Sequence, residues 1–196
     1  MSIGNENRTR AVALEDAPLI LEIHTPTVKK NIPFALAALL IAVAPLCATT
    51  VQRLSLEDLA KRASRIVGGT VRDSKTFWSN NGKLILTNYV IDVDESIKGQ
   101  YARTIEVTTV GGRIGGVELH VSGMPSFTKG ETIVVFTESS GSYEVVLGLG
   151  QGKFKVENGE VSNQVTDLSF PDGRAGQQLI LPIGTFKNRI RTILGR

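Results

Sequence analysis

Few residues of this 196-residue chain have side chains suited to metal or nucleophilic chemistry, because it contains only two histidines and one cysteine. His24 and Cys47 both precede residue 50, so His120 is the only histidine in the rest of the chain. A zinc site needs three or four nitrogen, sulfur or carboxylate ligands. No nucleophile-elbow pattern accompanies His120 either. We therefore predict a structural histidine, with no metal and no cofactor.

Two glycine-rich segments have the composition of loops that bind anions on backbone amides. Residues 111–116 read GGRIGG, and residues 148–153 read GLGQGK. A dinucleotide or P-loop site requires a helix after the glycines, whereas a strand pattern follows both segments. GLGQGK also lacks the earlier glycine and the later Ser or Thr of a P-loop. We expect a hairpin or bulge that exposes Arg113 in the first segment, and closely packed or bent strands at the second.

Asp92, Asp94 and Glu95 form an acidic cluster at the end of an expected strand. Alternate residues of a strand share a face, so Asp92 and Asp94 would lie together. A weak calcium site would use such oxygens, but a solvated strand edge explains the cluster equally well and is the interpretation we favour. Glycoside hydrolysis needs two carboxylates roughly 5–10 Å apart, and nothing in the sequence places such a pair.

The most apolar segment of the chain covers residues 32–46 and follows Lys29 and Lys30. A membrane-spanning helix needs about 20 apolar residues, whereas the core of a signal peptide needs about 7–15 after a positive region. We predict a signal peptide at residues 28–48, cleaved after Ala48, with an uncleaved membrane anchor or a soluble core helix as the alternatives. Residues 1–27 are then an extension or the product of a misassigned translation start.

Removal of this segment would take Cys47, the only cysteine, out of the mature chain. Disulfides and thiolate metal sites would then be excluded. Lipidation of Cys47 would need a small residue directly before it. Leu46 is in that position, so lipidation is not expected. The remaining ~140 residues are enough to fold on a hydrophobic core alone.

Composition argues against a nucleic-acid partner. The formal net charge is +3, and residues 184–196 carry four basic residues and no acidic one. Elsewhere the signs of charge alternate, and the few aromatic residues are not interleaved with basic ones. Apolar residues make up 41% of the chain, as in a globular protein with a real core.

Periodicity predicts a helix, a series of short strands, a loop and a second helix. Ser55 and Asp58 have the spacing of an approximate capping box at the start of the first helix. Alternation and turn residues predict antiparallel strands at 65–72, 84–93, 103–110, 117–121, 131–138, 143–147 and 153–156. Residues 161–183 are expected to form a loop, and Thr185 to cap a basic helix within 184–196. The predicted fold is mainly β: an OB-like antiparallel β-barrel at residues 54–160, flanked by the N-terminal and the C-terminal helix.

The strand motifs themselves carry a resemblance. LEDLAKRASRIVGGTVRDS leads to a strand ending DESIKG, and GGRIGG, VSGMPSFTKGETIVVF and YEVVLGLGQGKFKV follow. Residues 54–156 resemble a family of uncharacterised exported bacterial proteins, in an arrangement similar to the netrin-like modules of tissue inhibitors of metalloproteinases. The resemblance implies a five-stranded OB-like barrel. Those inhibitors chelate zinc through an N-terminal cysteine, and the predicted mature chain has none, so no functional residue transfers.

These observations favour an exported, periplasmic or extracellular, non-enzymatic binding module. The predicted contact surface combines Arg113 with Met124, Pro125 and Phe127, on the expectation that these side chains are exposed. A protein or an oligosaccharide is the expected partner, because loops and faces of such barrels commonly bind them. The alternatives are a secreted hydrolase with an unrecognised carboxylate or serine site, which would use His120 or a carboxylate pair in a pocket, and a membrane-anchored accessory protein held by residues 32–46.

Overall fold

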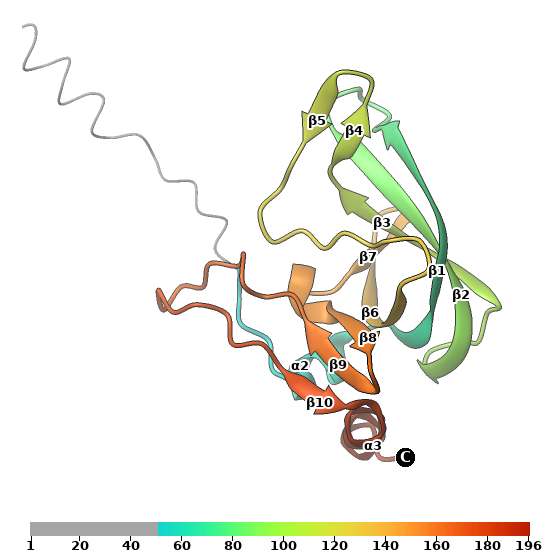
Figure 1. The fold of residues 1–196 in the computed structure, drawn as a ribbon, viewed down its shortest axis with the longest axis vertical. Coiled ribbons are helices and arrows are strands. Elements are labelled where there is room, and N and C mark those ends of the chain that lie inside the picture. The colour runs from blue at the N-terminus through green and yellow to red at the C-terminus, as the bar shows by residue number, and fades with distance from the viewer. Residues whose placement is uncertain (1–50) are drawn as a thin grey trace, which may run out of the picture. The chain divides into compact units, whose positions relative to one another are not determined.

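The computed structural model describes residues 51–196, which form a β-rich domain with two helices (Figure 1). The helices are α2 (Leu56–Arg62) and α3 (Ile183–Ile193), and η1 (Leu149–Gly152) is a short 3₁₀ turn. The strands are β1 (Arg65–Trp78), β2 (Ile85–Lys98), β3 (Thr104–Val110), β4 (Gly112–Ile114), β5 (Val117–Leu119), β6 (Thr132–Ser140), β7 (Tyr143–Val146), β8 (Lys153–Glu157), β9 (Glu160–Asn163) and β10 (Ile180–Pro182).

Eight of these strands form one antiparallel sheet in the order β10-β9-β8-β6-β1-β2-β3, with β7 paired to the far end of β6. The 14-residue strands β1 and β2 make its longest ladder, which is interrupted by three register shifts. One shift lies at Gly69, where a Cβ atom would stand 2.1 Å from the carbonyl oxygen of Asp92. Only glycine permits that approach of the two backbones. Strands β4 and β5 form a separate hairpin.

Strand β6 builds a core on each side of the sheet, because its side chains alternate between the two faces. Ile133 and Val135 belong to a cluster with Tyr89 and Phe127. Val134 and Phe136 belong to the cluster that the helices cover. The continuous apolar run of β6 therefore reflects burial on both faces.

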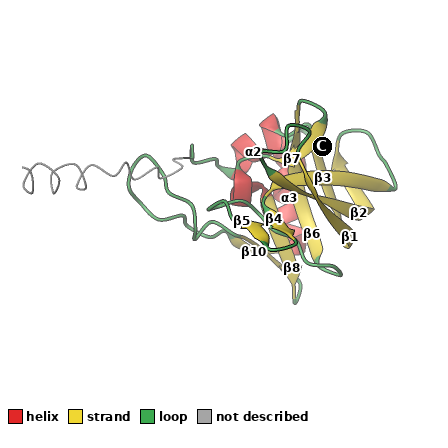
Figure 2. Cartoon of the chain, turned by 90° about the horizontal axis from the view of Figure 1, so that it is seen from above, coloured by secondary structure: helices red, strands yellow, loops and turns green. Residues whose placement is uncertain are grey.

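Both helices lie side by side on the second of these cores (Figure 2). Helix α2 begins with the predicted capping box: the amide of Asp58 donates to the hydroxyl of Ser55 (3.0 Å), and the amide of Ser55 donates to the Asp58 carboxylate (3.0 Å). Helix α3 buries Phe186 and Ile190, which lie four residues apart on one face of the helix.

Three details of the prediction are wrong. Residues 161–183 are not one loop, because β9 ends within them and β10 occupies their end. These pieces are too short to show an alternating pattern. Thr185 does not cap α3, which begins two residues earlier after Pro182 and has no side-chain cap. The described chain also has ten strands, more than the predicted number.

The predicted signal peptide at 28–48, its alternatives and the extension at 1–27 lie outside the described residues. Within residues 51–196, neither helix has the length and apolar character needed to cross a bilayer.

Candidate functional site

Strands β3 and β7 are edge strands that lie beside each other without a hydrogen-bonded ladder. Some of their Cα atoms are within 8 Å of one another, yet β3 pairs only with β2, and β7 only with β6, in the described sheet. The amide of Gly111 donates to Ile85 (2.8 Å) and that of Leu147 to Phe136 (2.9 Å). Alternate backbone groups face opposite ways in a strand, so those of Val110 and Val146 face this seam.

A groove of about 390 Å³ opens across the seam, and we call it the seam groove. Its wall is mainly aliphatic. It also contains two threonines and two charged residues, Arg62 of α2 and Glu138 of β6. The remaining lining residues are Val51, Gln52, Leu54, Thr108, Thr109, Val110, Met124, Val145, Val146, Leu147, Gly148 and Leu149. The groove thus combines residues of β3 and β7 with the segment that precedes α2.

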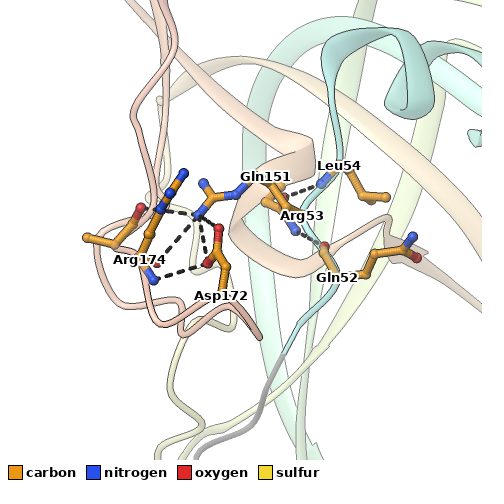
Figure 3. A network of polar contacts seen from close by, with 7 residues as sticks. Gln52, Arg53, Leu54, Gln151, Asp172 and Arg174 are labelled. Carbon is orange, nitrogen blue, oxygen red and sulfur yellow. Dashed lines mark hydrogen bonds and ion pairs between the residues drawn. The ribbon is translucent and has the colours of Figure 1, made fainter.

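That segment, residues 51–54, is held in place by Gln151 (Figure 3). The Gln151 side chain, in η1, is buried; its Oε1 accepts from the amide of Leu54 (2.8 Å), and its Nε2 donates to the carbonyls of Gln52 (3.1 Å) and Gly148 (3.1 Å). The side-chain amide of Gln151 thus makes two bonds to residues 51–54 and one to the turn between β7 and η1. The groove wall is therefore a fixed part of the fold, since each of these buried polar groups would otherwise lose its partner.

Arg53 ties the same segment to the loop that follows β9. Its guanidinium lies 4.0 Å from the centre of the Phe170 ring. It also donates to the Asp172 carboxylate (3.4 Å) and to the carbonyl of Arg174 (3.4 Å), as Figure 3 shows. The ion pair is exposed and contributes little by itself, but the ring contact fixes the direction of the arginine.

A second, more polar hollow of about 210 Å³ adjoins the seam groove at Met124. It lies between the β4–β5 hairpin and the sheet, and His120, Glu118 and Tyr89 are among its lining residues. His120 is exposed, and among residues 51–196 its ring makes no hydrogen bond to a serine or a carboxylate. The hydrogen-bonded chain of a Ser-His-Asp triad is thus not formed by the described residues.

The four residues predicted to share a contact surface lie in different surroundings. Arg113 is exposed at the β4–β5 hairpin and pairs with Glu118 (2.7 Å). Met124 is half-buried between the two hollows. Pro125 and Phe127 are buried, and the Phe127 ring packs on Tyr89 with 4.8 Å between the ring centres. The expected exposure of Pro125 and Phe127 is therefore wrong, and only Met124 reaches the seam groove.

A buried ion pair between Lys153 and Glu131 escaped sequence analysis. Their side chains are 2% and 8% exposed, and Lys153 Nζ lies 2.8 Å from Oε1 of Glu131. The same ammonium donates to the carbonyl of Ser126 and lies 4.7 Å from the centre of the Phe127 ring. Burial lowers the pKa of Lys153, and Glu131 opposes that shift. Because the Lys153 ammonium bonds both the Glu131 carboxylate and the carbonyl of Ser126, the pair holds the 126–131 loop on β8.

The acidic cluster lies within β2, which continues to Lys98, and its members Asp92 and Glu95 form ion pairs. Asp92 pairs with Arg72 (3.0 Å), and Glu95 pairs with Lys187 and Arg191 of α3, each at 2.6 Å. The hydrogen bond from Lys187 is the main cause that lowers the pKa of Glu95. Within residues 51–196 no group of three or more histidine, cysteine or acidic side chains is arranged to hold a metal ion. Glu95 therefore fastens α3 to β2, and Asp92 links β2 to β1.

Comparisons with known protein families, curated proteins and solved structures gave no match for this chain.

Proposed function

We propose that this protein is an exported, non-enzymatic binding module that holds a small apolar molecule in the seam groove. The observation that carries the proposal is the aliphatic lining of this groove, at about 390 Å³. Sites for small molecules are commonly about 300–1,000 Å³ in volume, mostly apolar, with a few polar groups that orient the ligand. The seam groove has this composition.

We also propose an OB-like barrel as the framework of the site. The ladders connect β3 to β2, β2 to β1, β1 to β6 and β6 to β7. Because β7 returns beside β3, these five strands nearly complete a ring. The ring stays open at the seam, where no hydrogen-bonded ladder joins β3 to β7. The mouths and walls of such barrels are common ligand sites.

The lining favours an apolar ligand over an oligosaccharide. An oligosaccharide carries many hydroxyl groups, and an aliphatic wall would leave those hydroxyls unpaired on burial. An apolar molecule leaves none unpaired, and the hydroxyl of Thr108, which donates to Asn88 (3.3 Å), can still accept one hydrogen bond from a polar end of the ligand. Arg62 of α2 and Glu138 of β6 carry opposite charges, so together they do not give the groove one sign of charge.

The same lining supports binding over catalysis. It contains no histidine, cysteine, serine, lysine or aspartate, and its two charged residues come from separate elements. Nucleophilic catalysis needs a nucleophile beside a base, and acid–base catalysis needs a titratable group that faces the substrate. The hydrolase alternative would have to use His120 in the neighbouring hollow, without the partners that activate a serine.

Fluorescence titration with N-phenyl-1-naphthylamine, a neutral apolar probe, tests the groove. We expect the probe to bind the wild-type protein and to bind Val145→Arg at least about tenfold more weakly, since a tenfold change corresponds to about 1.4 kcal/mol. The charged side chain would occupy the groove and repel an apolar ligand. Thr108→Arg tests the opposite wall in the same way.

The matched control is Ile180→Arg, which places the same charge on an exposed apolar residue of β10. Circular dichroism shows whether each variant is folded. If the wild type does not bind the probe, or if both groove variants bind it as well as the Ile180→Arg control does, the seam groove is not the site.

Export is proposed from residues 28–48 alone. N-terminal sequencing of the protein recovered from its native host is expected to begin at Thr49, because the small residue Ala48 ends the apolar segment. A mature chain that retains residues 32–46 would contradict export by cleavage and support the membrane-anchored alternative.

A further inference from the structure

Three large apolar side chains are exposed at the end of the molecule where the β1–β2 ribbon turns. Trp78, Leu84 and Val117 are 43%, 42% and 51% exposed. Trp78 closes β1 opposite Ile85 of β2, and the amide of Ser79 donates to the carbonyl of Leu84 (2.8 Å). Trp78 and Leu84 thus stand on the two sides of the same turn.

The β4–β5 hairpin brings Val117 to this end of the molecule. The hairpin leaves the ribbon at Gly112, where a Cβ atom would lie 2.8 Å from the side chain of Thr76 and 2.5 Å from that of Thr87. That contact places the base of the hairpin directly on the ribbon. From there the hairpin rises beside the ribbon to the same end of the domain, as Figure 1 shows.

Basic residues flank these apolar side chains along the chain. Residues 74–88 contain Lys75 and Lys83 and no acidic residue, and residues 107–117 contain Arg113 and no acidic residue. Glu118 adjoins the second stretch and pairs with Arg113 at 2.7 Å. We call these six residues, three apolar and three basic, the distal tip: Trp78, Leu84, Val117, Lys75, Lys83 and Arg113.

We propose that the distal tip binds the surface of membranes that contain anionic lipids. Tryptophan prefers the membrane–water interface, where its ring contacts the acyl boundary and its N–H stays hydrated. Lysine and arginine beside such apolar groups are attracted by the negative potential of anionic lipids. The tip carries apolar side chains, including a tryptophan, and basic side chains at one end of the domain. Its positive charge complements the negative charge of anionic lipids, so we infer that its partner is a lipid surface.

This inference is independent of the seam groove, because no residue of the tip lines that groove. It also differs from an anchor formed by residues 32–46, since it uses the folded domain. The tip's attraction to lipid would weaken with added salt, as expected for exposed charges.

Trp78 is the only tryptophan of the chain, so its fluorescence reports on the tip alone. The experiment adds vesicles of phosphatidylglycerol and phosphatidylcholine, or of phosphatidylcholine alone, to the full-length protein. We expect a blue shift of Trp78 emission, and quenching by brominated acyl chains, only with the anionic vesicles. Even if residues 32–46 also bind the vesicles, Trp78 emission changes only when the tip itself enters the interface.

The Lys75→Gln/Lys83→Gln double variant is expected to need several-fold more anionic lipid for the same shift, and Leu84→Asp to abolish the quenching. The matched control is Tyr101→Asp, an exposed aromatic residue beyond the opposite end of β2, which should behave as the wild type. Unchanged Trp78 emission with anionic vesicles would overturn the proposal. A shift of equal size with both kinds of vesicle, or one unaffected by the tip variants, would overturn it as well.

Discussion

Replacing Glu131 with glutamine is expected to lower the free energy of unfolding by about 3–5 kcal/mol, the usual effect of removing one partner from a buried ion pair. The ammonium of Lys153 would stay 2% exposed without its counter-charge. The carbonyl of Ser126 and the Phe127 ring would remain as its contacts, and neither neutralises a full charge. Urea unfolding of the two proteins measures the difference.

The loss is expected to depend on pH in a defined direction. Burial lowers the pKa of Lys153 from its ordinary value of 10.5, and Glu131 acts against that shift. Without Glu131 the pKa falls further, so between the folded and the ordinary pKa the unfolded chain binds more protons than the folded chain. Stability then rises with pH in that interval, and the deficit of Glu131→Gln should be largest near neutral pH and shrink as pH approaches 10.5.

The control for this prediction is Glu157→Gln, which breaks an exposed pair with Lys155 of the same length, 2.8 Å. Exposed pairs contribute about 0–1 kcal/mol, so this variant should unfold like the wild type at every pH. The double variant Glu131→Leu/Lys153→Met is expected to recover most of the loss, because it buries no charge. A loss below about 1 kcal/mol for Glu131→Gln, or a loss independent of pH, would contradict the assigned role of the pair.

Phe186→Ala is expected to destabilise the domain by about 3–5 kcal/mol, as large-to-small substitutions of buried phenylalanines do. Phe186 is fully buried, and its ring centre lies 4.6 Å from that of Phe154 and 6.2 Å from that of Phe136. It is the main side chain by which α3 enters the core between the sheet and the helices. Its loss removes the aromatic contacts of α3 with β6 and β8, and it leaves a cavity under α3.

Urea unfolding measures the loss, and amide hydrogen exchange locates it, because α3 should exchange faster than β1 or β2 in the variant. Tyr101→Ala is the matched control, since Tyr101 is the most exposed of the large apolar side chains, and its change should stay within about 0.5 kcal/mol. Equal exchange of α3 in Phe186→Ala and the wild type would contradict the role given to this ring.

The helices, strands and turns of this fold are predictable where the sequence pattern that specifies them lies within a few neighbouring residues. Ser55 and Asp58, three residues apart, have the spacing of a capping box and so predict the start of α2. The apolar run from Ile133 to Phe136 predicts a central strand, and two-sided burial confirms it. The turn at residues 79–82 carries its own Asn and Gly residues. None of these signals depends on distant parts of the chain.

The surroundings of individual side chains were harder to predict, because they depend on distant partners. Lys153 and Lys155 are two residues apart in the same strand, yet only Lys153 is buried, since it meets Glu131 from the loop before β6. Phe127 lies in an irregular segment with no hydrophobic period, and only its contacts with distant residues such as Tyr89 and Lys153 show that it belongs to the core. The pattern of each strand gives no sign of these contacts.

The seam groove itself could not be predicted from the sequence. Its two walls, β3 and β7, are separated by the β4–β5 hairpin, the 120–131 segment and β6. Met124 was singled out for its neighbours in the sequence, and the structure places it in the groove for a different reason, as the residue between the two hollows. A seam without ladder bonds leaves no trace in hydrophobic periodicity.

The most direct test of the proposed function is a methyl NMR titration of the protein with N-phenyl-1-naphthylamine. The proposal predicts saturable shifts of the Val110, Val145, Val146 and Met124 methyl groups, and probe-to-methyl NOEs at the same residues, because these side chains line the seam groove. The methyl groups of Val117 and Ile180 should stay unchanged, since both are exposed outside it. Shifts confined to residues outside the groove, or none at all, would contradict the proposed function.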